Sequence, residues 1–116
     1  METLCKIRDI QTAIQRFGIE FEKESNLSLN EGMLLSALMK DNILSSVDLA
    51  KKIGLTCSNG ARVLKSLEEQ SLIIRSVSKD DKRIVYFSLT KDGVTKINAV
   101  KTALINIPTE LKPLLG

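Results

Sequence analysis

A short stretch near the middle of the chain is rich in side chains that can hydrogen-bond to nucleic acid. Short polar, small and basic residues stand at Cys57, Ser58, Asn59, Ala61, Arg62 and Lys65. Asparagine can pair bidentately with adenine and arginine with guanine, each pair giving about 1–3 kcal/mol of discrimination. Asn59 and Arg62 are therefore candidates for reading base edges, although Arg62 could equally hold a phosphate. The plainer alternative is that Ser58 and Asn59 only cap and solvate a helix.

A second cluster of charged residues follows in the segment 79–83. Asp81 and Arg83 are two residues apart, which allows the carboxylate to hold the guanidinium by a charge-assisted, bidentate hydrogen bond. Lys79 and Lys82 would contact phosphates, which position a protein on a duplex without reading its sequence. The alternative is that residues 79–83 form only a solvated turn rich in charge. This alternative would be favoured if the chain had no helix-turn-helix.

Both clusters lie in the part of the chain with an excess of positive charge. Residues 51–83 carry eight basic and four acidic side chains, whereas residues 1–50 carry five basic and eight acidic ones. The net charge of the whole chain is only +3. A local basic excess is typical of a nucleic-acid contact surface, but a solvated helix face gives the same count.

Residues for catalysis or metal binding are scarce in the sequence. The chain has no histidine, and Cys5 and Cys57 are not arranged in a CxxC spacing. We therefore expect no structural metal and no cofactor. The adjacent carboxylates at 68–69 and 80–81 have no apolar surroundings in the sequence that would tune their pKa values. An enzymatic function is not expected.

Length and composition indicate one ordinary globular domain over residues 1–116. The chain is 43% hydrophobic and 27% charged, a balance typical of such domains. No apolar run approaches the roughly 18 residues of a membrane span, and the first residues lack a signal peptide's apolar segment. We expect a cytoplasmic location and no membrane partner.

Apolar spacing predicts two helices in the first part of the chain. Apolar residues recur every three or four positions from Leu4 to Phe21, the pattern of a long amphipathic helix. The polar segment 22–26 breaks this pattern and is expected to be a loop. Asn30 could cap a second helix that ends near residues 40–42.

Two shorter helices joined by a tight turn are expected next. The candidate caps are Ser45 or Ser46 for the third helix and Thr56 or Ser58 for the fourth. Gly54 would close the third helix in a left-handed conformation, and the fourth would end near Gln70. Gly60 inside the fourth helix either permits close packing against the third or weakens the helix until DNA binds; we favour close packing. This arrangement predicts a helix-turn-helix.

The periodicity then changes from helical to extended. The β-branched runs 72–78 and 83–89 surround a polar turn at 79–82, which predicts a β-hairpin. Thr90 could cap a last amphipathic helix that Pro108 stops.

These elements predict a mainly α fold with a small β-hairpin (α+β), organised as a winged helix-turn-helix. A DNA-binding lobe would span residues 27–90, with the wing at 72–89. Terminal helices at 4–24 and 91–115 would carry dimerisation.

The apolar stripes of the terminal helices are wider than one small core needs. The residues expected at a dimer interface are Leu4, Ile7, Ile10, Ile14, Phe17, Ile97, Leu104 and Ile107. A two-fold dimer would place two recognition helices about 34–36 Å apart. The alternative is that both stripes fold back within a monomer.

Two motifs in this order resemble the MarR family of bacterial transcription regulators. The first is DLAKKIGLT at 48–56, continued by LKSLEE at 64–69 and by Leu72-Ile73. The second is KDDKR at 79–83, followed by SLTKDG at 88–93. The resemblance covers residues 27–95 well and the flanking helices only by pattern.

The resemblance implies a sequence-specific regulator of transcription that binds double-stranded DNA as a homodimer, a repressor at a pseudo-palindromic operator. It implies that Arg83 reaches the minor groove and that a small-molecule effector, whose identity the sequence does not give, binds between the dimer helices and the DNA-binding lobe. It also raises peroxide sensing at Cys5, but a simple thiol is favoured because no histidine is present to lower its pKa. The alternative function is a winged-helix module whose basic segment binds an acidic protein.

Overall fold

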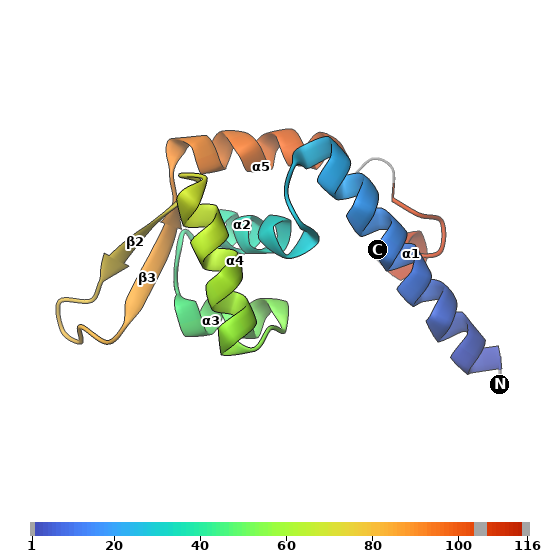
Figure 1. Ribbon diagram of the computed structural model, residues 1–116, viewed down its shortest axis with the longest axis horizontal. Helices are drawn as coiled ribbons and strands as arrows, with labels where there is room; N and C mark the ends of the chain where they lie inside the picture. The colour runs from blue at the N-terminus through green and yellow to red at the C-terminus, as the bar shows by residue number, and fades with distance from the viewer. Residues whose placement is uncertain (1, 104–106, 115–116) are drawn as a thin grey trace.

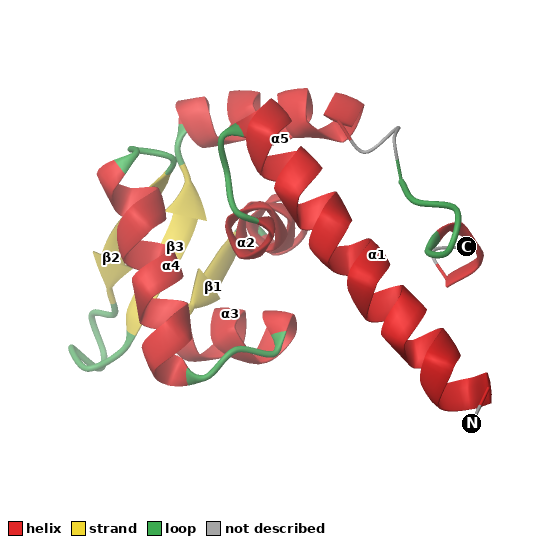
Figure 2. Cartoon of the chain, turned by 45° about the vertical axis from the view of Figure 1, so that its right-hand side comes forward, coloured by secondary structure: helices red, strands yellow, loops and turns green. Residues whose placement is uncertain are grey.

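Helix α2 runs through the middle of the molecule, and the other helices and a small sheet are arranged around it (Figure 1, Figure 2). The computed structural model describes residues 2–103 and 107–114. In chain order the elements are α1 (Glu2–Ser25), α2 (Leu29–Asp41), β1 (Ile43–Ser45), α3 (Ser46–Ile53), α4 (Cys57–Glu69), β2 (Ile73–Val77), β3 (Val85–Leu89), α5 (Lys91–Ala103) and the 3₁₀ turn η2 (Lys112–Leu114).

The fold is mainly helical with a small antiparallel sheet, as the sequence predicts. Strands β2 and β3 form the expected hairpin, with Arg75 opposite Phe87. Strand β1, which the sequence pattern did not predict, pairs with the other side of β3 and gives the strand order β1-β3-β2. This strand has only three residues, too few for an alternating pattern to be recognised.

The helix caps agree with most of the predicted ones. Ser45 is the cap of α3 and Thr56 the cap of α4, each accepting a backbone N–H at 3.1–3.2 Å. Thr90 accepts the backbone N–H of Gly93 at 3.0 Å and begins α5. The predicted cap Asn30 is wrong, because Ser28 caps α2 in a capping box with Glu31.

Helix α1 continues through residues 22–25, so the loop expected for the polar segment 22–26 is wrong over these residues. The reason is that Ser25, one turn after Phe21, is buried and continues the inner face of the helix. The turn begins only at Asn26, whose φ is +60°. In Figure 1 the N-terminal part of α1 points away from the rest of the molecule.

The core lies between α2, α3, α4, α5 and the inner face of the sheet. Its largest fully buried side chains are Leu27, Leu34, Leu35, Leu38, Leu49 and Leu67. Ile97 is only 2% exposed and belongs to this core. Its assignment to a dimer interface is therefore corrected, since the protomer itself covers its side chain.

The C-terminal part of the chain also differs from the prediction. The structure assigns α5 to Lys91–Ala103, and Ile107, expected within a helix, lies in an irregular segment. The predicted interface residue Leu104 lies outside the described residues. The amphipathic helix expected between Thr90 and Pro108 is thus assigned as α5, and the short turn η2 lies in the apolar piece that follows Pro108.

Gly93 fits α5 tightly against the segment that follows α4. The hydroxyl of Thr90 donates to the carbonyl oxygen of Ser71 at 2.7 Å, which brings the two segments together. A Cβ at Gly93 would overlap the carbonyl oxygen of Leu72. A glycine is therefore required at this helix start.

We expect Gly93→Ala to lower the free energy of unfolding by about 2–3 kcal/mol, because backbone has to move to relieve the overlap. The measurement is urea unfolding followed by circular dichroism. Gly18→Ala is the matched control, since a Cβ at Gly18 meets nothing within 4 Å. Alanine there should raise stability by up to about 1 kcal/mol through helix propensity. Equal effects of the two substitutions would contradict the packing argument.

Candidate nucleic-acid interface

The turn between α3 and α4 brings the two helices into close contact. Gly54 ends α3 in the left-handed conformation, with φ +69°. Gly60 is buried where α4 meets α3, and a Cβ there would lie 3.1 Å from the Cβ of Ala50. The interpretation of Gly60 as a close-packing residue is thereby confirmed.

Helix α4 turns its polar side to solvent. All six side-chain positions predicted to face DNA are exposed: Cys57, Ser58, Asn59, Ala61, Arg62 and Lys65. The opposite side of the helix is buried through Gly60, Leu64 and Leu67. Because Thr56 provides the cap, capping does not account for Ser58 and Asn59. A helix with exposed polar residues in its first turns has the form needed to enter a major groove.

Strand β2 is tied to α4 by an ion pair that the sequence analysis missed. The guanidinium of Arg75 donates to both carboxylate oxygens of Glu68, at 3.0 and 2.8 Å. It also lies 5.6 Å from the ring centroid of Phe87. The hydrogen bonds to Glu68 and its negative charge raise the pKa of Arg75. The one sequence signal for this contact was strand alternation. It places Arg75 on the same side of β2 as the buried Ile73, and so on the side that faces the rest of the protein.

In the wing, Asp81 holds Arg83 as predicted. The guanidinium donates to the two carboxylate oxygens at 3.1 and 3.2 Å, and the backbone N–H of Arg83 donates at 3.0 Å. These side-chain and backbone hydrogen bonds lower the pKa of Asp81. The Arg83 side chain is nevertheless 91% exposed. The guanidinium is thus oriented by the protein and accessible from outside.

The turn that carries Asp81 is itself ordered by Ser78. The Ser78 hydroxyl oxygen accepts the backbone N–H groups of Asp80 and Asp81, both at 3.2 Å. Lys79 and Lys82 are exposed on the same turn. In Figure 1 the tip of the wing and the N-terminal end of α4 point to the same side of the molecule. The structure therefore places the polar residues of α4 and the charged residues 79–83 on one side of the molecule, on two different elements.

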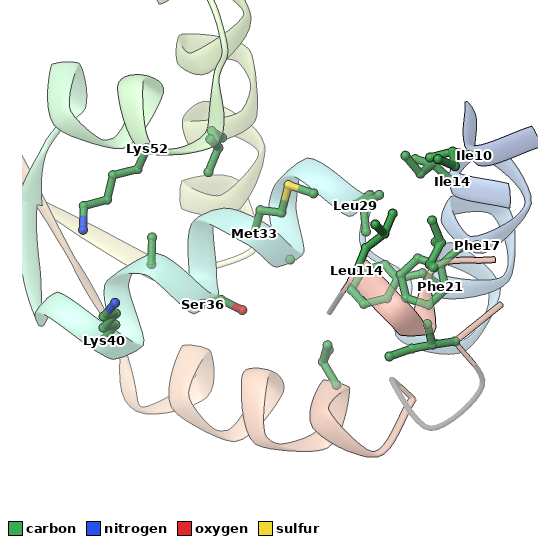
Figure 3. A pocket seen from close by; sticks show the side chains of 16 residues that line it. Ile10, Ile14, Phe17, Phe21, Leu29, Met33, Ser36, Lys40, Lys52 and Leu114 are labelled. Atoms are coloured by element: carbon green, nitrogen blue, oxygen red, sulfur yellow. The ribbon is translucent and has the colours of Figure 1, made fainter. Parts of the chain in front are cut away.

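A second surface, apolar in character, lies at the other end of the molecule. A groove of about 1000 Å³ runs between α1, α2, α3, α5 and the C-terminal segment. Figure 3 shows Ile10, Ile14 and Phe17 of α1 at one end of this groove and Lys40 and Lys52 at the other. Of the predicted dimer residues, Leu4, Ile7 and Ile14 are exposed and Ile10, Phe17 and Ile107 are half-buried.

Metal-binding clusters and membrane-spanning helices are absent from residues 2–103 and 107–114. Among them no group of three His, Cys, Asp or Glu side chains is placed to hold a metal ion. No helix there is long and apolar enough to cross a membrane. Cys5 and Cys57 are both exposed thiols, at the beginning of α1 and of α4 respectively.

Two proteins of Bacillus subtilis are similar to this chain over nearly its whole length. The uncharacterized HTH-type transcriptional regulator YdgJ is 28% identical, over 98% of this chain and 73% of its own length. The uncharacterized HTH-type transcriptional regulator YwaE is 25% identical, over 96% of this chain and 67% of its own length.

Solved structures show the same fold. A cysteine-to-serine mutant of MarR from E. coli, complexed with operator DNA, superposes with a TM-score of 0.79 at 17% identity, over 98% of this chain and 90% of that one. A mutant of MepR from S. aureus bound to an oligodeoxyribonucleotide superposes with a TM-score of 0.67 at 19% identity, over 99% of this chain and 90% of that one. The MarR family model matches residues 27–85. The chain therefore belongs to the MarR family of winged helix-turn-helix transcriptional regulators, which bind DNA and are not enzymes.

Proposed function

We propose that the protein represses transcription by binding a pseudo-palindromic operator sequence-specifically as a homodimer. The observation that carries this proposal is the exposed polar side of α4, which stands on the same side of the molecule as a wing with an oriented arginine. A mutant of MarR from E. coli, which has the same fold, was solved in complex with operator DNA. This supports the proposal that the present chain also binds an operator.

In the proposed complex, the first turns of α4 enter the major groove. Asn59 reads adenine and Arg62 reads guanine, both by bidentate hydrogen bonds to base edges. Cys57, Ser58, Ala61 and Lys65 complete the contact surface. Arg83 of the wing enters the adjacent minor groove, while Lys79 and Lys82 contact phosphates. All these side chains are at least partly accessible in the free protein.

The proposed dimer forms through the terminal regions, 4–24 and 91–115. Leu4 is 65% exposed, Ile7 47% and Ile14 43%, so α1 carries an apolar row that its own protomer leaves open. Contiguous apolar surface of this kind commonly marks an interface. The residues 27–90 then form the DNA-binding lobe. A groove of about 1000 Å³ between lobe and terminal segments is also large enough for a small-molecule effector.

Arg62→Ala should reduce the preference for a selected duplex over a random one by about 1–3 kcal/mol, since the lost contact is to a base. Lys79→Ala should weaken both duplexes alike and reduce the salt slope by about 1. The measurement is fluorescence anisotropy at two salt concentrations, with a duplex selected from a random pool. A wild-type protein without sequence preference would favour the alternative, an interaction module for an acidic protein.

Asp81→Asn should weaken DNA binding about 5–20-fold although it removes a negative charge. The reason is that Arg83 would lose the partner that orients it. Asp80→Asn is the matched control, because it makes the same charge change one residue away. Anisotropy titrations of both variants decide the point: if both bind more tightly than wild type, only net charge matters at the wing.

Ile7→Glu should raise the dimer dissociation constant at least about 100-fold, because each dimer would bury the new charge twice. Thr12→Glu is the control, since Thr12 is exposed and lies about 140° around the helix from Ile7. Sedimentation velocity over a concentration series measures both constants. An unchanged dimer in Ile7→Glu, or a monomeric wild type, would contradict the proposed interface.

A further inference from the structure

Glu31 is a charged residue in the first turn of α2 that the proposed DNA contacts do not use. The residue is only 9% exposed. One carboxylate oxygen, Oε1, accepts the backbone N–H of Ser28 at 2.9 Å. The other, Oε2, accepts the Ser66 hydroxyl at 2.8 Å and the Gln70 side-chain amide at 2.7 Å. The carboxylate therefore connects the beginning of α2 with the last turn of α4.

The surroundings of Glu31 favour its charged form. Burial by itself raises the pKa of this carboxyl group, but the hydrogen bonds from Ser28, Ser66 and Gln70 outweigh burial, and the net effect is a lowered pKa. The position in the first turn of a helix also favours a negative charge. At neutral pH the carboxylate is thus an acceptor for all of these donors, and a neutral amide could not replace it in full.

The contact lies on the side of α4 that continues from Arg62. Residues 62, 66 and 70 follow at intervals of four and so lie along one side of the helix. Apolar contacts at Leu64 and Leu67 hold α4 against the core, but such contacts are non-directional. The hydrogen bonds to Glu31 are directional. They therefore restrict rotation of α4 about its axis, and that rotation sets the direction of the Arg62 side chain.

We propose that Glu31 is a positioning residue for DNA recognition, which acts through Ser66 and Gln70 to fix the rotation of α4 relative to α2. This inference rests on the proposed sequence-specific DNA binding. Glu31 itself lies in α2 and is buried, so its effect on DNA is indirect. Substitution of Glu31 should therefore change how well the protein discriminates between DNA sequences and leave its contacts to phosphates unchanged.

The test compares Glu31→Gln with Glu69→Gln, an exposed position on α4 where the same charge is removed. We expect Glu31→Gln to lower the ratio of selected-duplex to random-duplex affinity about tenfold, because an amide has one acceptor oxygen and cannot accept from Ser28, Ser66 and Gln70 together. Glu69→Gln should keep the wild-type ratio. A merely structural role would reduce the folded fraction and weaken both duplexes equally, which thermal unfolding of each variant would detect.

Gln70→Ala provides a second test at an exposed position, in case Glu31→Gln folds poorly. It should lower the same ratio in the wild-type background and have no further effect in the Glu31→Gln background. If both Glu31→Gln and Gln70→Ala keep the wild-type ratio of selected-duplex to random-duplex affinity, the inference is overturned and the proposed function stays intact. A wild-type protein without any sequence preference would overturn both.

Discussion

The first turn of α2 is the constraint on which the arrangement of the helices depends. Glu31 faces α4 and binds its last turn, while the next residue, Gly32, faces α1. A Cβ at Gly32 would lie 2.6 Å from Cζ and 2.9 Å from Cε1 of Phe21. The absence of a side chain thus lets the ring of Phe21 pack directly on α2. Two consecutive residues of α2 thus contact both α4 and the long helix α1.

The second requirement is that α4 be held firmly without covering its polar side. Its contacts reach three elements: α3 through Gly60, α2 through Ser66 and Gln70, and β2 through Glu68. A glycine within a helix costs about 1 kcal/mol relative to alanine, and here that cost permits the close approach to Ala50. Since these contacts leave the exposed side of the first turns free, rigidity and access to a duplex coexist in one helix.

Features that depend on nearby residues could be predicted from the sequence. The caps at Ser45 and Thr56, the turn at Gly54 and the pair Asp81–Arg83 all involve residues within a few positions of one another. Strand β1 could not be recognised, because its three residues become a strand only by pairing with β3, more than 40 positions later. Likewise, the periodic pattern of α5 identified Ile97 as apolar but could not indicate whether its own chain or a second one would cover it.

The same distinction applies within the interface. Sequence reasoning found which side of α4 would be polar, because helical spacing alone decides that. It could not find the contacts proposed to fix the rotation of that side. Glu31 meets Ser66 and Gln70 across 35 and 39 positions, and Arg75 meets Glu68 across a turn between helix and strand. Residues proposed to touch a base are thus visible as exposed polar residues in a helical pattern. Residues that aim them are buried or paired, and only the packing of the helices brings them together.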